Sequence, residues 1–316
     1  MRGMDDGVDG ANGEPAGLGV ALGGGMARGA AHVGVLHALA DAGLPPARYA
    51  GTSYGAIIAA LAALGASPAE LRRVVTRETA ATLWRDAADV GLHRGALVHG
   101  DRLARWFDRT LFHGARIEDA AAPLAIAATD LATGALRVVT RGPVADAVRA
   151  SCALPGLFAP ATVAGERWVD GGFAEPVPFA ALRALGPGAS LGVHAGVDLA
   201  GAGTLGRLRR LDGGGIGRAL HRAADRVRGR NGASAALKGA SLALRSYRHD
   251  AVAPRGATLL TVAPPIAWWD FHRADTAIEA GVAAVAAWRA GAPRATDDAA
   301  RALPAALVGR LEGGGA

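Results

Sequence analysis

Cysteine is nearly absent from this sequence, because Cys152 is the single one among 316 residues. A disulfide within the chain and a cysteine-rich zinc site are therefore excluded. Long hydrophobic runs are also missing: the longest, Tyr54–Ala66, has thirteen residues, whereas a membrane-spanning helix needs about 20. Residues 1–16 lack the basic start and apolar core of a secretory signal. We therefore expect a cytoplasmic protein, with peripheral membrane contact left open.

Glycine and hydrophobic residues, by contrast, are abundant. The 46 glycines indicate many tight turns, and 51% hydrophobic residues suffice for one large domain or two modest ones. Short apolar strands alternate with helices, which predicts an α/β fold with a mainly parallel sheet. We expect strands at Leu18–Leu22, Leu124–Thr129, Leu136–Thr140, Trp168–Val169, Leu191–Val197 and Thr258–Val262. We expect helices at Ala30–Ala42, Ala56–Leu64, Asp101–Phe107 and Val144–Ser151. One more helix is expected to begin at the capping box that Ser67 and Glu70 form.

Charge is concentrated in one segment. Residues 201–250 hold eleven basic side chains and three aspartates, a net +8, whereas the whole chain carries +6. Their apolar residues follow a helical spacing, so we expect two basic helices as an insertion or cap of a domain over 17–290, between tails at 1–16 and 291–316. These helices would dock on anionic lipid. The alternative is an arginine-rich solvated surface, and no nucleic-acid recognition motif accompanies the charge.

Ser53 lies in the pentapeptide Gly51–Gly55, which has the pattern Gly-x-Ser-x-Gly, between an expected strand and a buried helix. Such a sharp turn lifts the serine hydroxyl clear of the backbone, and the glycines let neighbouring segments pass closely. The start of the helix also directs free N–H groups and the positive end of its dipole at the hydroxyl. Taken alone, the pattern is a weak signal, and a strand–helix turn that contains an incidental serine is favoured.

A glycine-rich loop, Gly23–Gly29, also joins an expected strand to a helix. Backbone N–H groups in such a loop can bind the oxyanion that forms when a serine attacks an ester. Two alternatives are a plain helix-start turn and a dinucleotide-binding loop. The dinucleotide loop requires an acidic residue at the end of the next strand, and the segment Leu44–Tyr49 contains none.

Asp170 follows a short apolar strand and precedes two glycines, so its carboxylate is expected to face a cleft; an Asp-Gly turn is the simpler alternative. The glycine loop, Gly-x-Ser-x-Gly and Asp-Gly-Gly occur in this order along the chain. With them the sequence resembles the patatin-like phospholipases, especially the compact bacterial members. The matching stretches are Leu22–Leu36, Gly51–Ala59, Ala127–Leu131, Ala150–Phe158 and Trp168–Pro178, with a fainter return over 270–281.

The resemblance implies a three-layer α/β/α sandwich that hydrolyses lipid acyl esters through an acyl-serine intermediate, without metal or cofactor. It implies a dyad in which Ser53 is the nucleophile and Asp170 its base. Met26 and Tyr54 depart from the family, which often has small residues at both places, and this leaves the size of the substrate open. The implied oxyanion hole consists of Gly24, Gly25 and the Met26 N–H, with Arg28 as the family's basic residue beside it.

Two rival functions remain. An ordinary α/β-hydrolase would need a histidine after the acid, and His194, His221, His249 and His272 are available. The other rival is a catalytically idle lipid-binding scaffold, which the presence of both Ser53 and Asp170 disfavours.

Several other residues are interpreted as structural. We expect Asp130 to end a strand and organise a turn, Cys152 to be a small buried hydrophobe and His32 to pack on the helix after the glycine loop. Core packing is favoured over an acyl pocket for the aromatic residues Trp268, Trp269 and Phe271.

Overall fold

An eight-stranded sheet forms the centre of the computed structural model, which describes residues 17–77, 90–93, 96–98, 100–155, 157–196 and 251–291. The strand order is β10-β9-β1-β2-β5-β8-β7, with β6 paired to β5. The five strands from β10 to β5 are mutually parallel, whereas β6, β8 and β7 add antiparallel pairs. The strands are β1 Gly19–Leu22, β2 Arg48–Thr52, β5 Leu124–Asp130, β6 Leu136–Val139, β7 Ala161–Val163, β8 Glu166–Asp170, β9 Ser190–Ala195 and β10 Thr258–Val262, and a separate hairpin joins β3 Val90–His93 to β4 Ala96–Val98.

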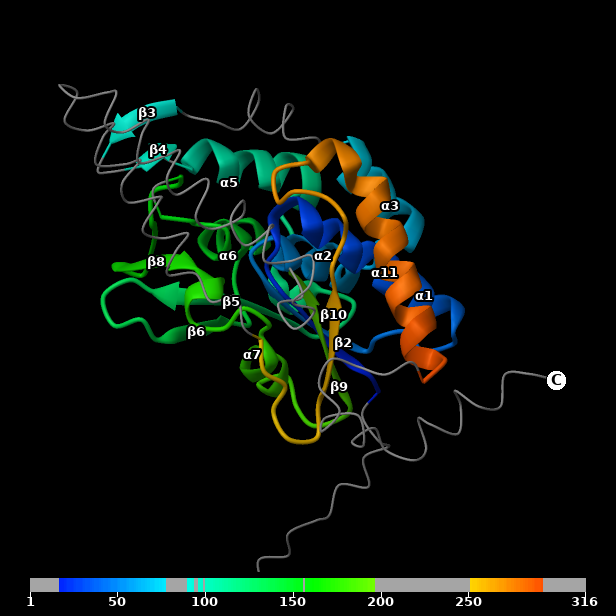
Figure 1. Ribbon diagram of the computed structural model, residues 1–316. Helices are drawn as coiled ribbons and strands as arrows, with labels where there is room; N and C mark the ends of the chain where they lie inside the picture. Colours follow the sequence, from blue (N-terminus) through cyan, green and yellow to red (C-terminus); the bar gives the residue numbers. More distant parts are fainter. Residues whose placement is uncertain are drawn as a thin grey trace, which may run out of the picture.

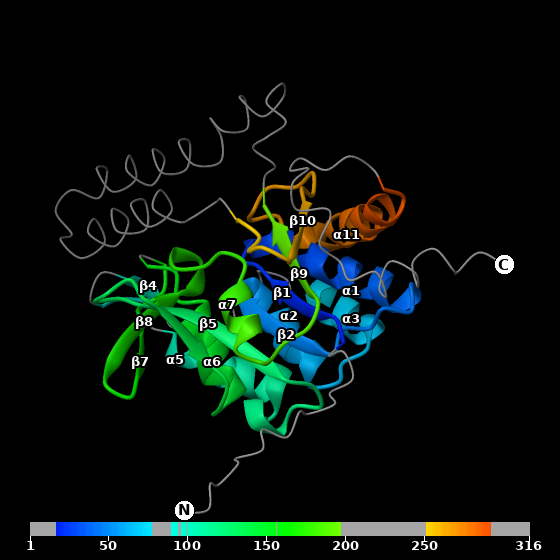
Figure 2. The ribbon, with the colours of Figure 1, turned by 90° about the horizontal axis from the view of Figure 1, so that it is seen from below.

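Helices cover both faces of the sheet, so the described chain is a three-layer α/β/α sandwich (Figures 1 and 2). Most helices pack on one face, and α7 contacts β1, β2, β5 and β9 on the other. The helices are α1 Ala31–Asp41, α2 Tyr54–Ala63, α3 Pro68–Arg77, α5 Asp101–Phe107, α6 Val144–Ser151, α7 Phe179–Arg183 and α11 Ala274–Arg289.

The two faces of the sheet differ in side-chain size. On β5, Leu124 and Ile126 join the large core beneath most of the helices, whereas Ala125 and Ala127 face the small core around α7. The same alternation occurs on β1, because successive side chains of a strand point to opposite faces. The alanine face therefore lets α7 approach the sheet closely.

The predicted α/β class is confirmed, and most predicted elements lie within two residues of the observed ones. The capping box is present: the Ser67 N–H donates to Glu70 Oε2 at 2.8 Å, and the Glu70 N–H donates to Ser67 Oγ at 3.3 Å. The sequence pattern did not predict the β3–β4 hairpin, β7, α7, α11 and a short 3-10 turn at Met26–Ala30. All but one of these are five residues or shorter, too short for a hydrophobic period to appear.

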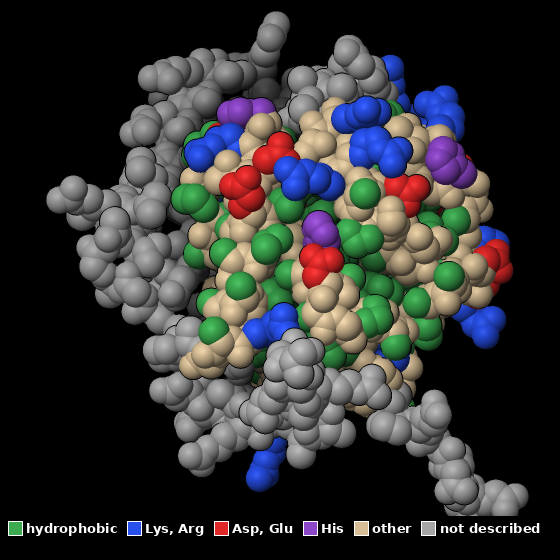
Figure 3. Space-filling model, turned by 90° about the vertical axis from the view of Figure 1, so that its right-hand side faces the viewer, with side chains coloured by type: hydrophobic (Ala, Val, Ile, Leu, Met, Phe, Trp, Pro, Cys, Tyr) green, Lys and Arg blue, Asp and Glu red, His purple; other side chains and the backbone are tan. Residues whose placement is uncertain are grey.

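Helices α1 and α11 are in close contact, although they lie at opposite ends of the described chain. Two glycines allow this approach. A Cβ at Gly34 would lie 1.9 Å from the Ile278 carbonyl oxygen, and a Cβ at Gly281 would lie 2.1 Å from that of Ala31. Figure 3 shows the face on this side of the molecule, where charges of both signs are interspersed among hydrophobic side chains.

Segment 201–250 and the tails at 1–16 and 292–316 fall outside the described residues, so the predicted basic helices and the lipid contact of that segment stay predictions. Among the helices that the structure describes, none combines the length and hydrophobicity needed to cross a bilayer.

Candidate active site

Ser53 occupies a sharp turn between β2 and α2. Its backbone adopts φ 55° and ψ −125°, a region that residues other than glycine rarely adopt. The flanking glycines are needed for space. A Cβ at Gly51 would lie 2.4 Å from the Ala56 Cα, and a Cβ at Gly55 would lie 2.2 Å from the Leu22 carbonyl oxygen. The pentapeptide therefore forms a strained strand–turn–helix elbow, which is the geometry expected of a nucleophile.

The glycine loop runs from β1 into the 3-10 turn, close to the elbow. The Gly24 N–H is already used, since it donates to the Pro176 carbonyl at 3.1 Å. The N–H groups of Gly25 and Met26 make no hydrogen bond to another described residue. Met26 also has φ 51°, in the left-handed region that favours glycine. Two backbone donors are therefore available here, both on a loop held in a strained conformation.

The segment after β10 braces this loop. The Ala27 N–H donates to the Trp268 carbonyl at 2.9 Å, and Arg28 Nε donates to the Ile266 carbonyl at 3.0 Å. The Arg28 side chain is thus tied to a neighbouring segment and is absent from the residues that line the cavity described below.

His32 supports the loop from the other side. It is fully buried on α1, as predicted, and its Nε2 lies 2.7 Å from the Gly23 carbonyl oxygen. Because a carbonyl can only accept, Nε2 carries the proton. Burial lowers the pKa of His32 to about 4, although the bond to Gly23 opposes the shift. The imidazole is therefore neutral at pH 7.

Acid should destabilise the fold through His32. Above pH 6.5 the imidazole is neutral in both states; as the pH falls toward 4 only the unfolded chain takes up the proton, so the free energy of unfolding decreases. The pKa of His32 falls from 6.5 in the unfolded chain to about 4 in the folded protein, which corresponds to about 3 kcal/mol of folding stability. This contribution is lost in full below pH 4. Urea unfolding from pH 7 to 4 should show a shallower decline for His32→Gln than for wild type, with exposed His37→Gln as control. Equal slopes for wild type and His32→Gln would contradict this role.

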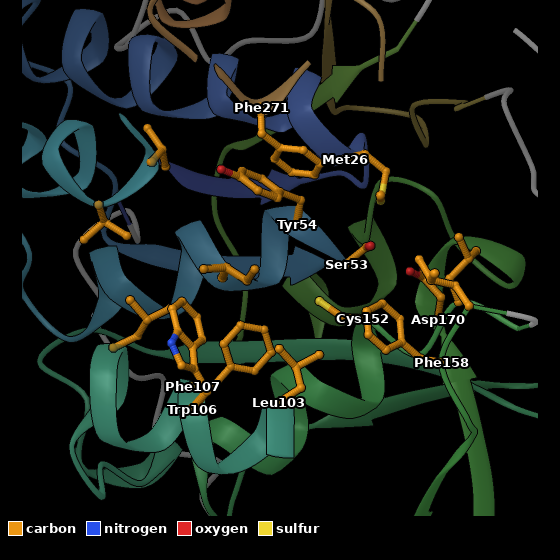
Figure 4. Close-up of a pocket in the computed structure, with 16 residues that line it drawn as sticks. Met26, Ser53, Tyr54, Leu103, Trp106, Phe107, Cys152, Phe158, Asp170 and Phe271 are labelled. Carbon is orange, nitrogen blue, oxygen red and sulfur yellow. The ribbon is translucent and has the colours of Figure 1, made fainter. Parts of the chain in front are cut away.

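Strand β5 sets the separation of Ser53 and Asp170. It pairs with β2 on one side, where Thr52 lies opposite Ala127, and with β8 on the other, where Asp170 lies opposite Ala128. The serine and the aspartate thus flank one strand at the same level, about two strand spacings or 10 Å apart in the backbone. Their side chains point toward one another across this strand (Figure 4).

Asp170 is held in place at the end of β8. Its side chain is 2% exposed, and Oδ1 accepts from the Gly172 N–H at 2.8 Å. The hydroxyl of Thr129 donates to the Asp170 carbonyl at 2.8 Å. A Cβ at Gly171 would lie 2.4 Å from the Ala127 carbonyl oxygen, so the Asp-Gly-Gly sequence reflects close backbone packing against β5.

Ser53 and Asp170 line the same cavity, which has a volume of about 120 Å³. In Figure 4 the two residues lie at one end, and the aromatic side chains of Trp106 and Phe107 from α5 lie at the other. Most of the lining is hydrocarbon, and much of it comes from helices α2, α3 and α5 and from the segment that follows α6. The lining residues are Met26, Ser53, Tyr54, Ile57, Val74, Val75, Leu103, Trp106, Phe107, Leu111, Cys152, Leu154, Leu157, Phe158, Asp170 and Phe271.

Of the aromatic residues near position 270, Phe271 packs against the large core as predicted and also lines the cavity, whereas the core prediction was wrong for Trp269. The ring centroid of Phe271 lies 6.2 Å from that of Tyr54, whereas Trp269 is 47% exposed. Cys152 is only partly buried and lines the cavity; burial raises the pKa of its thiol, which therefore stays protonated.

Asp130 behaves as predicted. It ends β5, and its Oδ1 accepts from the N–H groups of Ala132 and Thr133 at 2.9 Å. Its Oδ2 accepts from Arg137 Nη2 at 2.8 Å.

Histidine does not line this cavity in the described part of the chain. Neither His194 nor His272 lines it, and His221 and His249 lie outside the described residues. Across the same described ranges, no three His, Cys, Asp or Glu side chains gather as metal ligands would.

The fold and the site together form an α/β/α sandwich that carries a strained serine elbow, a glycine loop and a buried aspartate. The sequence model of the patatin-like phospholipase family matches residues 20–183, just over half of the chain, and the chain belongs to this family. The match contains the glycine loop, the serine elbow and the Asp-Gly-Gly sequence, and thus confirms the resemblance.

Curated relatives each match a little over half of this chain. A patatin-like phospholipase domain-containing protein of Caenorhabditis elegans is 35% identical over 54% of this chain and 13% of its own length. An uncharacterised NTE family protein of Mycobacterium tuberculosis is 33% identical over 52% of this chain and 45% of its own. Lysophospholipase NTE1 of Coccidioides immitis is 33% identical over 57% of this chain and 11% of its own. The matches thus span less than half the length of these relatives.

A solved structure confirms the fold. VipD from Legionella pneumophila superposes with a TM-score of 0.53 at 13% sequence identity, covering 87% of this chain and 66% of that one.

Proposed function

We propose that this protein is a serine acyl hydrolase that cleaves lipid acyl esters. The observation that carries the proposal is that Ser53, on its strained elbow, and Asp170 face one another at one end of a single apolar cavity. Membership of the patatin-like phospholipase family supports the same chemistry.

The proposed reaction uses groups of this chain together with the ester and one water molecule. Asp170 takes the proton from Ser53 Oγ as the oxygen attacks the ester carbonyl carbon. The oxyanion that forms accepts hydrogen bonds from the free N–H groups of Gly25 and Met26. The Gly24 N–H is engaged by the Pro176 carbonyl, so Gly24 contributes by holding the loop in place. Collapse of the intermediate expels the alcohol, which takes the proton from Asp170. Asp170 then takes a proton from water as the water attacks the acyl-serine, and it returns this proton to Ser53 Oγ as the fatty acid leaves.

The rival triad finds no support at the cavity, because no described histidine lines it. In the dyad, the aspartate must therefore receive the serine proton directly. The facing orientation of the two side chains is consistent with that transfer.

The cavity suits one acyl chain. Its lining is mostly hydrocarbon, and it extends from the nucleophile toward Trp106 and Phe107. Each methylene that leaves water for such a site contributes about 0.8 kcal/mol. We propose that this cavity holds the acyl chain that is cleaved and that the substrates are single-chain lipids such as lysophospholipids, which agrees with the name of the NTE1 relative.

Turnover of a lysophospholipid series with acyl chains from butanoyl to palmitoyl tests this function. Wild type should release fatty acid, and its kcat/KM should rise with chain length. Absence of turnover for every lysophospholipid and for p-nitrophenyl butyrate would favour the idle scaffold.

Ile57→Trp in the same series tests the cavity. Ile57 lines it one helical turn beyond the nucleophile, so the larger ring should fill the chain's path. Excluding four methylenes should lower kcat/KM for the palmitoyl substrate about 100-fold and leave the butanoyl substrate nearly unchanged. Val282→Trp, at a position 40% exposed on α11, is the matched control. An equal loss for all chain lengths would contradict the cavity as the acyl site.

A further inference from the structure

Ser151 is a buried polar residue without an assigned role. It ends α6 and is 0% exposed. Its hydroxyl donates to the Ala127 carbonyl oxygen of β5 at 2.6 Å and accepts from the Ser53 N–H at 2.8 Å. One side chain thus links the backbone of the nucleophile to the strand that separates it from Asp170.

The nucleophile needs such a link. A non-glycine residue at φ 55° is strained, and strain of this kind persists only where the surroundings over-determine it. The glycines of the pentapeptide only provide space. The Ser53 carbonyl is held by the Ala56 N–H at 2.9 Å, and the Ser53 N–H is held by Ser151. Both peptide groups of the turn are therefore fixed.

The same bond limits what can bind the oxyanion. In Ser-His-Asp proteases the N–H of the nucleophilic serine is itself one of the oxyanion donors. Here that N–H is engaged by Ser151, whereas those of Gly25 and Met26 have no partner among the described residues.

We propose that Ser151 is a positioning residue for the nucleophile: its hydroxyl locks the Ser53 backbone and leaves oxyanion binding to the glycine loop. This inference rests on the proposed function. Because Ser151 aligns Ser53 without being needed to bind the acyl chain, its loss should lower kcat and the rate of fluorophosphonate labelling while KM stays constant. A purely structural role would lower the unfolding temperature without this selective change.

The experiment compares Ser151→Ala, Ser151→Cys and Ser151→Thr with wild type in the full-length protein, well below each unfolding temperature. Ala lacks the hydroxyl, Cys offers only a weak donor and acceptor, and Thr retains the hydroxyl. We expect kcat and the labelling rate to fall about 10- to 100-fold in Ala and Cys, with KM unchanged, and to recover to within about threefold of wild type in Thr. Thr258→Val, which removes a buried hydroxyl on β10, should behave as wild type.

Wild-type kcat in a folded Ser151→Ala protein would overturn the inference. If Ser151→Ala does not fold, Ser151→Cys decides by the same measurements: slow turnover with unchanged KM supports the inference, and wild-type kcat overturns it. If neither folds, Ser151→Thr decides, because a folded Thr variant with a kcat more than about tenfold low would show that the hydroxyl does not position Ser53. An inactive, unlabelled wild type would instead refute the proposed function.

Discussion

Ser53→Ala is expected to reduce ester hydrolysis to background and to leave the unfolding temperature nearly unchanged. The replaced side chain is small and is 6% exposed at the cavity. The bond that holds the turn uses the backbone N–H of residue 53, which alanine retains. Without Oγ no acyl-serine can form, so the whole covalent pathway is lost. Calorimetry together with turnover of p-nitrophenyl butyrate measures both expectations.

Covalent labelling separates this result from a general loss of structure. A fluorophosphonate should modify wild type at Ser53, as mapped by mass spectrometry of the peptide, and should leave Ser53→Ala unlabelled. Ser190→Ala, which removes a hydroxyl from β9 outside the cavity, is the control and should label as wild type does. Persistent labelling of Ser53→Ala would place the nucleophile elsewhere.

Asp170→Asn should lower kcat about 10²- to 10⁴-fold, because an amide cannot take the serine proton. The amide oxygen can still accept the hydrogen bond from the Gly172 N–H, so the turn after β8 should remain. Asp130→Asn is a matched control: this aspartate is also buried at a strand end and accepts backbone hydrogen bonds, but it lies outside the cavity. Asp130→Asn should lower the stability of the fold and leave kcat nearly unchanged. Equal kcat for wild type and Asp170→Asn would remove the base assignment.

Single replacements of histidine by alanine separate the dyad from a triad. His194, His221, His249 and His272 should each be replaceable with most of the activity retained. A histidine variant as inactive as Ser53→Ala would favour the triad.

The sequence predicted best those features that depend on neighbouring residues. The capping box at Ser67 and Glu70 and the bounds of α5 and α6 agree with the structure, because caps and short apolar periods are local. The elbow around Ser53 was also predictable. Its glycines are required by contacts with the following helix and with β1, which the motif anticipates.

Features that depend on distant segments were not predictable. The cavity joins Ile57 of α2, Trp106 of α5 and Phe271 after β10, and no local pattern shows that these meet. The support from Ser151 and His32 depends likewise on single hydrogen bonds to backbone atoms of other segments. Helix α11 was missed because alanine is its most frequent residue and its apolar stripe is weak. Its contact with α1 explains Gly281.

The position of β1 has a consequence for how the chain folds. Gly19 pairs with Arg48 on one side and with Ser190 on the other, so one edge of β1 finds its partner early during synthesis and the other edge only after most of the domain has been made. Until β9 emerges from the ribosome, an apolar parallel strand keeps an unpaired edge, which invites association with other chains. The chain between β1 and β9 is a large loop that must close before these strands pair, and this also makes folding slow. The sheet can therefore be completed only after β9 and β10 have been made, although the residues proposed for catalysis all precede them.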